Sequence, residues 1–202
     1  MKSAGLVTSK TSVVFHSWTI DTGPLVESNE EIWDEISAAL DKGKVESAAA
    51  ALRHHLEYAS RHLADQLGAQ PQFRADGDYD LGELLPSVLS RKDKLLRKAT
   101  NAARSWGNDS EKELAVEHGT SLSGSMGAST VEQWALNKAV HYNAWANFGK
   151  KDFEPVVVTF RELLDRFRCE KCDSWLYVTP KRGTLESLRC GCAKINFNLK
   201  PK

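Results

Sequence analysis

The alternation of hydrophobic and polar residues along this chain is mainly that of amphipathic helices. The clearest stripe begins at Val45, repeats every three or four residues and ends before Gly68; its apolar positions are 48, 49, 52, 56, 59, 63 and 67. A stripe of this period faces a core in an α-helix, and a glycine directly after it is a common helix end. The pattern therefore predicts a long helix over 45–67.

Two more helices are predicted on either side of this one. Residues 28–43 open with Ser-Asn-Glu-Glu, a capping box that can satisfy the first amides of a helix. Farther along, Asp80 can cap a helix over 81–106, which Pro86 would kink or interrupt.

The second half of the chain carries two further helical patterns. Residues 119–130 are mostly small and predict a flexible connector, after which Thr130 can cap a helix that runs through Val140. An i, i+3, i+4, i+7 series then runs from Phe153 to Phe167. Because this last helix leads directly into the cysteine segment, we expect that segment to be mounted rigidly on the bundle.

A single strand is predicted before the helices. Residues 11–18 are β-branched and aromatic, and Asp-Thr-Gly-Pro at 21–24 reads as a turn. The pattern offers no second strand until the C-terminal segment, and a lone strand needs a partner. We therefore expect residues 1–27 to pair with a sheet outside this chain.

All four cysteines lie near the C-terminus, in two close pairs: Cys169 with Cys172, and Cys190 with Cys192. A Cys-x-x-Cys turn lets two thiolates converge on one ion, and a second pair completes a tetrahedron. The second pair is one residue shorter, which Gly191 allows. The spacing predicts a Zn²⁺ site, and four thiolates close the coordination shell, so the metal should be structural.

Residues 169–202 are read as a zinc ribbon. Short strands are predicted at 174–178, 187–189 and 194–199, with a turn at 180–183. Two alternatives compete with zinc. Two disulfides would need an oxidising compartment, and a redox Cys-x-x-Cys would not explain the second pair.

Composition fits a globular protein without a membrane segment. Of the 202 residues 41% are hydrophobic and 27% charged, which is enough apolar material for one core. No apolar run approaches the 18 residues or so of a spanning helix, and the first residues lack the apolar segment of a signal peptide. We expect a cytoplasmic protein.

Charge is balanced overall but not locally. The chain has 27 basic and 27 acidic residues, whereas the segment from 169 to 202 has seven basic residues against three acidic ones. Basic and aromatic residues together are typical of nucleic-acid surfaces. The candidates for binding DNA or RNA are Trp175, Tyr177, Lys181, Arg182 and Arg189.

The predicted helix over 81–106 also has a basic outer face, which is either a solvated surface or a phosphate-contacting one. Its members are Arg91, Lys92, Lys94, Arg97, Lys98 and Arg104. Three histidines, His54, His55 and His62, decorate the preceding helix. They have no acidic or cysteine partner at ligand spacing, and we expect partly solvated surface side chains.

Several motifs together resemble the C-terminal part of bacterial RecF/SMC-like ATPases of the phage-defence and restriction kind. They are Phe15–Trp18 with Thr22–Pro24, Leu52–Glu57, Tyr79–Leu85, Val140–Trp145 and the cysteine ribbon. The resemblance implies that the first strand belongs to an ATPase head and that the helices form a HEPN-like bundle. It also implies an ATPase head or another subunit as partner.

HEPN ribonucleases carry an Arg-x4–6-His motif in a composite, dimeric site. Here Asn137-Lys-Ala-Val-His141 keeps the histidine and lacks the arginine. A ribonuclease with His141 as general acid or base, assisted by Asn137 or Asn143 in a homodimer, is therefore the alternative function. The chain has no phosphate-binding G-x-x-x-x-G-K-[ST] loop, so it cannot hydrolyse ATP by itself.

These observations favour a mainly α protein: a short strand at 1–27, a helical bundle at 28–168 and a small β zinc ribbon at 169–202. The function we expect is that of a non-catalytic, zinc-containing interaction module. Its helices would bind protein partners, and its ribbon would bind nucleic acid. A purely structural zinc-stapled domain is the remaining alternative.

Overall fold

The computed structural model describes residues 15–19, 23–26, 29–72, 79–140, 149–179 and 186–202, with side chains from residue 32 onward except 130–140. The helices are α1 (Asn29–Asp41), α2 (Val45–Leu67), α3 (Leu81–Trp106), α4 (Asp109–Val140) and α5 (Lys150–Asp165). The strands are β1 (Phe15–Thr19), β2 (Gly23–Val26), β3 (Tyr177–Val178), β4 (Ser187–Arg189) and β5 (Asn196–Asn198). The predicted fold class, mainly α with a small C-terminal sheet, is confirmed.

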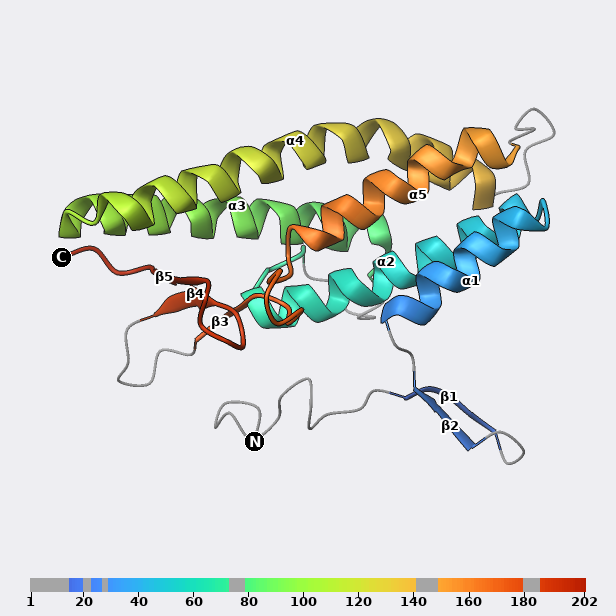
Figure 1. Ribbon diagram of the computed structural model, residues 1–202, viewed down its shortest axis with the longest axis horizontal. Coiled ribbons are helices and arrows are strands. Elements are labelled where there is room, and N and C mark those ends of the chain that lie inside the picture. Colours follow the sequence, from blue (N-terminus) through green and yellow to red (C-terminus); the bar gives the residue numbers. More distant parts are fainter. Residues whose placement is uncertain (1–14, 20–22, 27–28, 73–78, 141–148, 180–185) are drawn as a thin grey trace.

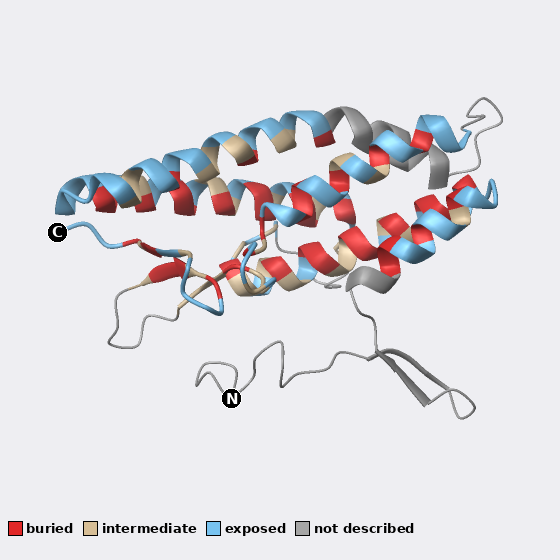
Figure 2. Cartoon of the chain, viewed as in Figure 1, coloured by how far each residue is buried: buried red, intermediate tan, exposed pale blue. Residues whose placement is uncertain are grey.

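The helices form a bundle of elongated, roughly aligned rods (Figure 1). Helix α2 packs against α1, α3 and α4, and α5 packs against α4 with smaller contacts to α1 and α2. The buried stripes of the helices face one another and the exposed residues face outward (Figure 2). The antiparallel sheet β3-β4-β5 lies beside the ends of α2 and α3.

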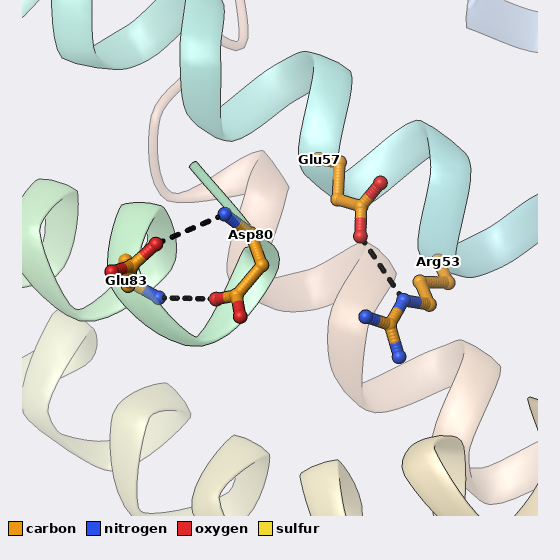
Figure 3. Close-up of polar contacts among 4 residues, drawn as sticks. All are labelled: Arg53, Glu57, Asp80 and Glu83. Atoms are coloured by element: carbon orange, nitrogen blue, oxygen red, sulfur yellow. Dashed lines mark hydrogen bonds and ion pairs between the residues drawn. The ribbon is translucent and has the colours of Figure 1, made fainter. Parts of the chain in front are cut away.

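Local sequence signals set the ends of α2 and α3. Gly68 adopts a φ of +65° after the last turn of α2, as the apolar stripe predicted. At the start of α3, the Asp80 carboxylate accepts from the Glu83 amide at 3.0 Å, and the Glu83 carboxylate accepts from the Asp80 amide at 3.2 Å (Figure 3). Pro86 lies within α3, which continues through it unbroken.

Surface ion pairs add little to the bundle. On α2, Arg53 and Glu57 are four residues apart and their charged groups meet at 3.0 Å (Figure 3). Both side chains are partly exposed, so the pair contributes about 0.3 to 0.5 kcal/mol. The bundle depends instead on its apolar core.

The predicted connector at 119–130 is wrong, because α4 passes through it as continuous helix. Two of its serine side chains bond the helix's own carbonyls: Ser123 donates to Gly119 and Ser129 donates to Met126. Leu122 and Ser129 are buried against neighbouring helices. Tertiary packing therefore overrides a composition with weak intrinsic helix preference.

The prediction that the first strand lacks a partner within the chain is also wrong. β1 pairs antiparallel with β2, which includes Gly23 and Pro24 of the predicted turn, with Phe15 opposite Val26 and Thr19 opposite Gly23. Pro24 is compatible with a two-stranded hairpin because its missing amide need not face the partner. The hairpin lies outside the helical layers (Figure 1).

Two residues predicted at the surface are buried. His55 is 3% exposed and lies edge-on to Trp33, with ring centroids 5.3 Å apart. Lys92 is 0% exposed and therefore does not belong to the basic outer face of α3. His54, by contrast, is exposed and His62 is half-buried, as expected for partly solvated side chains.

The Lys92 ammonium lies at the C-terminal end of α5. It donates a hydrogen bond to the Arg166 carbonyl and lies 4.5 Å from the centre of the Phe167 ring. A cation is favourable at a helix C-terminus and over an aromatic ring. Burial nevertheless dominates, and with the nearby Arg166 charge it lowers the Lys92 pKa from 10.5 to about 7.

The helical state of residues 119–130 can be tested with glycine substitutions. A Cβ added at Gly124 would meet no atom within 4 Å. In a helix interior, Gly124→Ala should raise the free energy of unfolding by about 0.5 to 1 kcal/mol. Urea denaturation followed by circular dichroism measures this. Gly43→Ala is the matched control and should be destabilising, because Gly43 has a φ of +70°. No stabilisation by Gly124→Ala would argue for a connector.

Burial of Lys92 predicts a specific pH dependence. Its folded-state pKa of about 7 lies below the 10.5 of the unfolded chain, so the unfolded state binds more protons between these values and stability rises with pH there. Lys92→Met should lack this rise. The free energy of unfolding of the variant minus that of the parent should therefore fall by roughly 2 to 3 kcal/mol between pH 7.5 and 9.5. A constant difference across that range would mean that Lys92 stays charged in the fold.

Candidate metal centre

The four cysteines are carried by two short turns. Cys169 follows the end of α5 closely, and Cys172 completes the first turn. Cys190 directly follows β4, and Cys192 lies in the loop that leads to β5. The first turn is thus held by the bundle, and the second by the sheet.

Both turns are closed by the same hydrogen bond despite their different lengths. In each, the amide of the first cysteine donates to the carbonyl five residues later: Cys169 to Ser174 at 3.1 Å, and Cys190 to Ile195 at 3.0 Å. The residue after the second cysteine adopts positive φ in both turns, +51° at Asp173 and +59° at Ala193. The shorter second turn therefore reproduces the geometry of the first.

Ser174 links the two turns. The Gly191 amide donates to the Ser174 Oγ at 2.7 Å, which leaves the hydroxyl hydrogen for the Cys172 Sγ at 3.1 Å. A Cβ at Gly191 would lie 3.2 Å from that Oγ. Gly191 therefore permits a close approach that a side chain would crowd, in line with the prediction that glycine lets the shorter turn tighten.

The sulfur positions fit one tetrahedral ion. All four Sγ atoms lie within 4.8 Å of one another. Cys192 Sγ is 3.8 Å from Cys169 Sγ and 3.6 Å from Cys190 Sγ. A tetrahedron with metal–sulfur bonds of 2.3 Å has sulfur–sulfur edges of about 3.8 Å.

The disulfide alternative does not fit these positions. All four cysteines are free. Their closest sulfurs are 3.6 Å apart, well beyond the ~2.05 Å of an S–S bond. The cluster as a whole can therefore hold a metal ion, and its four thiols would leave no coordination position open for a substrate.

The thiols differ in acidity because of their neighbours. The Ser174 hydroxyl lowers the Cys172 pKa to about 6. Burial opposes ionisation of Cys190, but the Ile195 amide and the adjacent thiols outweigh it and lower that pKa. The Lys194 amide favours the Cys192 thiolate, yet desolvation and the three other sulfurs raise the Cys192 pKa to about 11. Four neighbouring thiolates require a cation to neutralise them.

The first turn is fixed to α2 through Trp175. The Arg168 guanidinium lies 3.9 Å from the centre of the Trp175 ring and also donates to the Asp173 carboxylate at 2.7 Å. On α2, His62 lies with its ring 6.1 Å from that of Trp175. Trp175 is thus engaged in attaching the sheet to the bundle, a role that its sequence position did not indicate.

A shared core joins the sheet to the helices. Buried Phe167, Leu176, Leu188 and Phe197 belong to the same hydrophobic cluster as the helical core. Phe197 of β5 also lies edge-on to His118 of α4, with centroids 5.6 Å apart. The cysteine segment is thus packed on the bundle, as the sequence predicted.

Hydrogen bonds to α3 and α4 complete this attachment. The Asn198 amide donates to the Glu111 carboxylate at 2.7 Å, and the Trp106 indole donates to the Lys200 carbonyl at 3.0 Å. These contacts span 87 and 94 residues of sequence, so no local signal could have indicated them.

Of the other predicted site residues, Tyr177 and Arg189 are brought together as opposite partners in the β3–β4 pair. Trp175, Tyr177 and Arg189 are half-buried. Lys181, Arg182 and His141 lie outside the described residues, as does the side chain of Asn137, whose backbone is in α4. Sequence reasoning missed Ser174, Arg168 and Trp106; only the nearness of the first two to the cysteines could have suggested them.

Comparison with family models, with curated proteins and with solved structures gives no match for this chain. The resemblance to RecF/SMC-like ATPases therefore stays a prediction. Among the described helices, none combines the length and the apolar character that a membrane crossing requires.

The metal site leads to a prediction about Cys172. Cys172→Ser should lose the bound metal, since a three-thiolate site with a neutral hydroxyl is much weaker. Hydrogen exchange should then accelerate at β4 and β5, while most helical circular dichroism remains because most members of the shared hydrophobic cluster come from α1–α5. Elemental analysis measures the metal content.

Ser174→Ala is the matched control for this variant. It keeps four thiols and removes the hydroxyl that bonds both the Cys172 sulfur and the Gly191 amide, so it should retain the metal with about 10- to 100-fold lower affinity. A parent protein with no bound metal, or one with two native disulfides by mass spectrometry, would contradict the site.

Proposed function

We propose that this chain is a non-catalytic module that is stabilised by Zn²⁺ and binds nucleic acid. The metal is zinc because four thiolates in a tetrahedral arrangement suit this ion. It is structural because all four coordination positions are filled by thiols, two of which, Cys169 and Cys190, are buried. Its free energy of binding stabilises a sheet too small to fold alone.

The distribution of exposed charge supports a polyanionic ligand. Helix α3 exposes Lys94, Lys98 and Arg104, none of which takes part in an ion pair with any described residue. The fourth cation on that face, Arg97, is paired with Asp93 at 2.9 Å. In a chain of zero net charge, this concentration on one helix is the observation that carries the proposal.

The partner protein is a separate part of the proposal. The resemblance described above suggests an ATPase head of the RecF/SMC-like kind. The hairpin β1–β2 removes one reason for it, because β1 has a partner within the chain. What supports the partner is the set of quoted motifs alone, and copurification with a P-loop ATPase would test it.

Nucleic-acid binding should be independent of sequence and sensitive to salt. With about four phosphate contacts, the affinity for a single strand should fall roughly 50-fold between 50 and 200 mM salt. Fluorescence anisotropy with DNA and RNA strands of mixed sequence measures this. Absence of binding at low salt would leave only the stapling role of the metal. Binding unaffected by salt would contradict recognition through phosphates.

A further inference from the structure

The exposed cations of α3 lie along one side of the helix. Positions 94, 97, 98, 101, 104 and 105 are all exposed. At about 100° per residue they cover about a third of the helix circumference and about 17 Å of its length. We call this surface the α3 stripe; its basic members are Lys94, Arg97, Lys98 and Arg104.

The C-terminal residues lie across the end of this stripe. The Lys202 amide donates to the Ser105 Oγ at 2.8 Å, and the Trp106 indole donates to the Lys200 carbonyl at 3.0 Å. The Lys202 ammonium lies 5.8 Å from the centre of the Trp106 ring. These backbone contacts hold residues 200–202, the tail, against α3 while the Lys200 and Lys202 side chains remain exposed.

Trp106 adds a stacking surface to these charges. It is 50% exposed, the largest side chain among the exposed hydrophobic residues of the described chain. Its indole nitrogen is already hydrogen-bonded, which restricts the orientation of the ring. An exposed aromatic ring among cations is what single-stranded nucleic acids bind, with bases stacked on the ring and phosphates on the cations.

A continuous series of contacts connects the tail to the metal site. Cys190 donates its amide to Ile195 and accepts the Ile195 amide at its sulfur, at 3.3 Å. Ile195 leads directly into β5, where the Asn198 amide is bonded to Glu111 of α4. The Asn198 side chain then accepts from the Lys200 amide at 2.9 Å. The second cysteine turn is therefore connected to the tail through β5.

We propose that the α3 stripe, Trp106 and the tail form one binding surface for single-stranded nucleic acid, and that metal binding by the four cysteines holds the tail half of this surface in place. The inference rests on the proposed function and specifies where the strand lies. The metal acts at a distance, because no cysteine needs to touch the ligand. Charge complementarity selects a polyanion, and the exposed indole selects unpaired bases over a duplex.

The test uses the metal-loaded full chain and a labelled oligothymidylate of about 20 nucleotides, long enough to fill a typical single-strand site. One variant removes stripe charges, Lys94→Gln with Lys98→Gln, and another removes tail charges, Lys200→Gln with Lys202→Gln. Each variant should reduce the steepness of the plot of log binding constant against log salt concentration by about 1.4. Each should also weaken binding about 25-fold near 0.1 M salt.

The matched control removes two exposed cations elsewhere. Lys42→Gln with Lys44→Gln changes the net charge equally but lies at the turn between α1 and α2, at the end of the bundle away from the tail (Figure 1). It should leave the slope unchanged. If all three double variants bind the strand with the same affinity, the proposed location of the binding surface is wrong while the proposed function stands. If the parent binds no strand at all, the proposed function itself fails.

Trp106 is tested with two substitutions. Trp106→Ala should weaken single-strand binding about 5- to 150-fold, the effect of one stacked base. Trp106→Phe keeps an aromatic face and loses the hydrogen bond to Lys200, so it should retain most of the affinity if stacking matters. A Phe variant as weak as Ala would overturn the stacking role. Equal affinity of the parent for a duplex would overturn the preference for single strands.

Metal coupling is tested by comparing the parent and the tail variant with and without metal. Chelation should weaken binding by the parent about as much as the tail substitutions do, and it should add nothing in the tail variant. Binding through the α3 stripe then remains in both and shows that the helices are folded. Equal losses on chelation in both proteins, or no loss in the parent, would overturn the coupling.

Discussion

The four cysteine sulfurs lie within 4.8 Å of one another although they come from two separate turns of the chain. This convergence constrains how the C-terminal sheet can lie on the helices. The first pair follows α5 with Phe167 as the last buried residue before it, so its position is set by the helical core. The second pair follows β4 and can reach the first only if the sheet lies against the bundle. Trp175, Phe197 and Glu111 hold the sheet there.

The buried Lys92 belongs to the same arrangement. Its ammonium bonds the carbonyl of Arg166, between α5 and the first cysteine turn, and contacts Phe167. A buried amine is unfavourable in itself, and its low pKa reflects that. An uncharged amine can still donate to the carbonyl. The hydrogen bond from Lys92 to Arg166 therefore fixes the direction in which the chain leaves α5. Burial of the amine lowers the free energy of unfolding, so Lys92 contributes to the geometry of this region more than to its stability.

Signals confined to a few neighbouring residues predicted the structure well. The apolar stripe and Gly68 indicated the bounds of α2, Asp80 indicated the start of α3, and the cysteine spacing indicated that the four thiols cluster. Prediction failed where contacts between residues far apart in the sequence determine the structure. Residues 119–130 are helical because α4 packs along its neighbours, and His55 and Lys92 are buried because other helices cover them. Because the side chains of His55 and Lys92 are polar, the sequence gives no signal that they are buried.

The contrast between neighbouring and distant contacts also applies to Trp175 and Trp106. Trp175 lies beside the metal ligands in sequence and was the natural choice for a stacking residue, but its ring contacts Arg168 and His62. Trp106 lies at the end of a helix, 63 positions before Cys169, yet it is half exposed and adjoins the tail that follows the cysteine turns and β5. Because Trp175 attaches the sheet to the bundle, the cysteine-bearing segment can place its Lys202 ammonium beside Trp106.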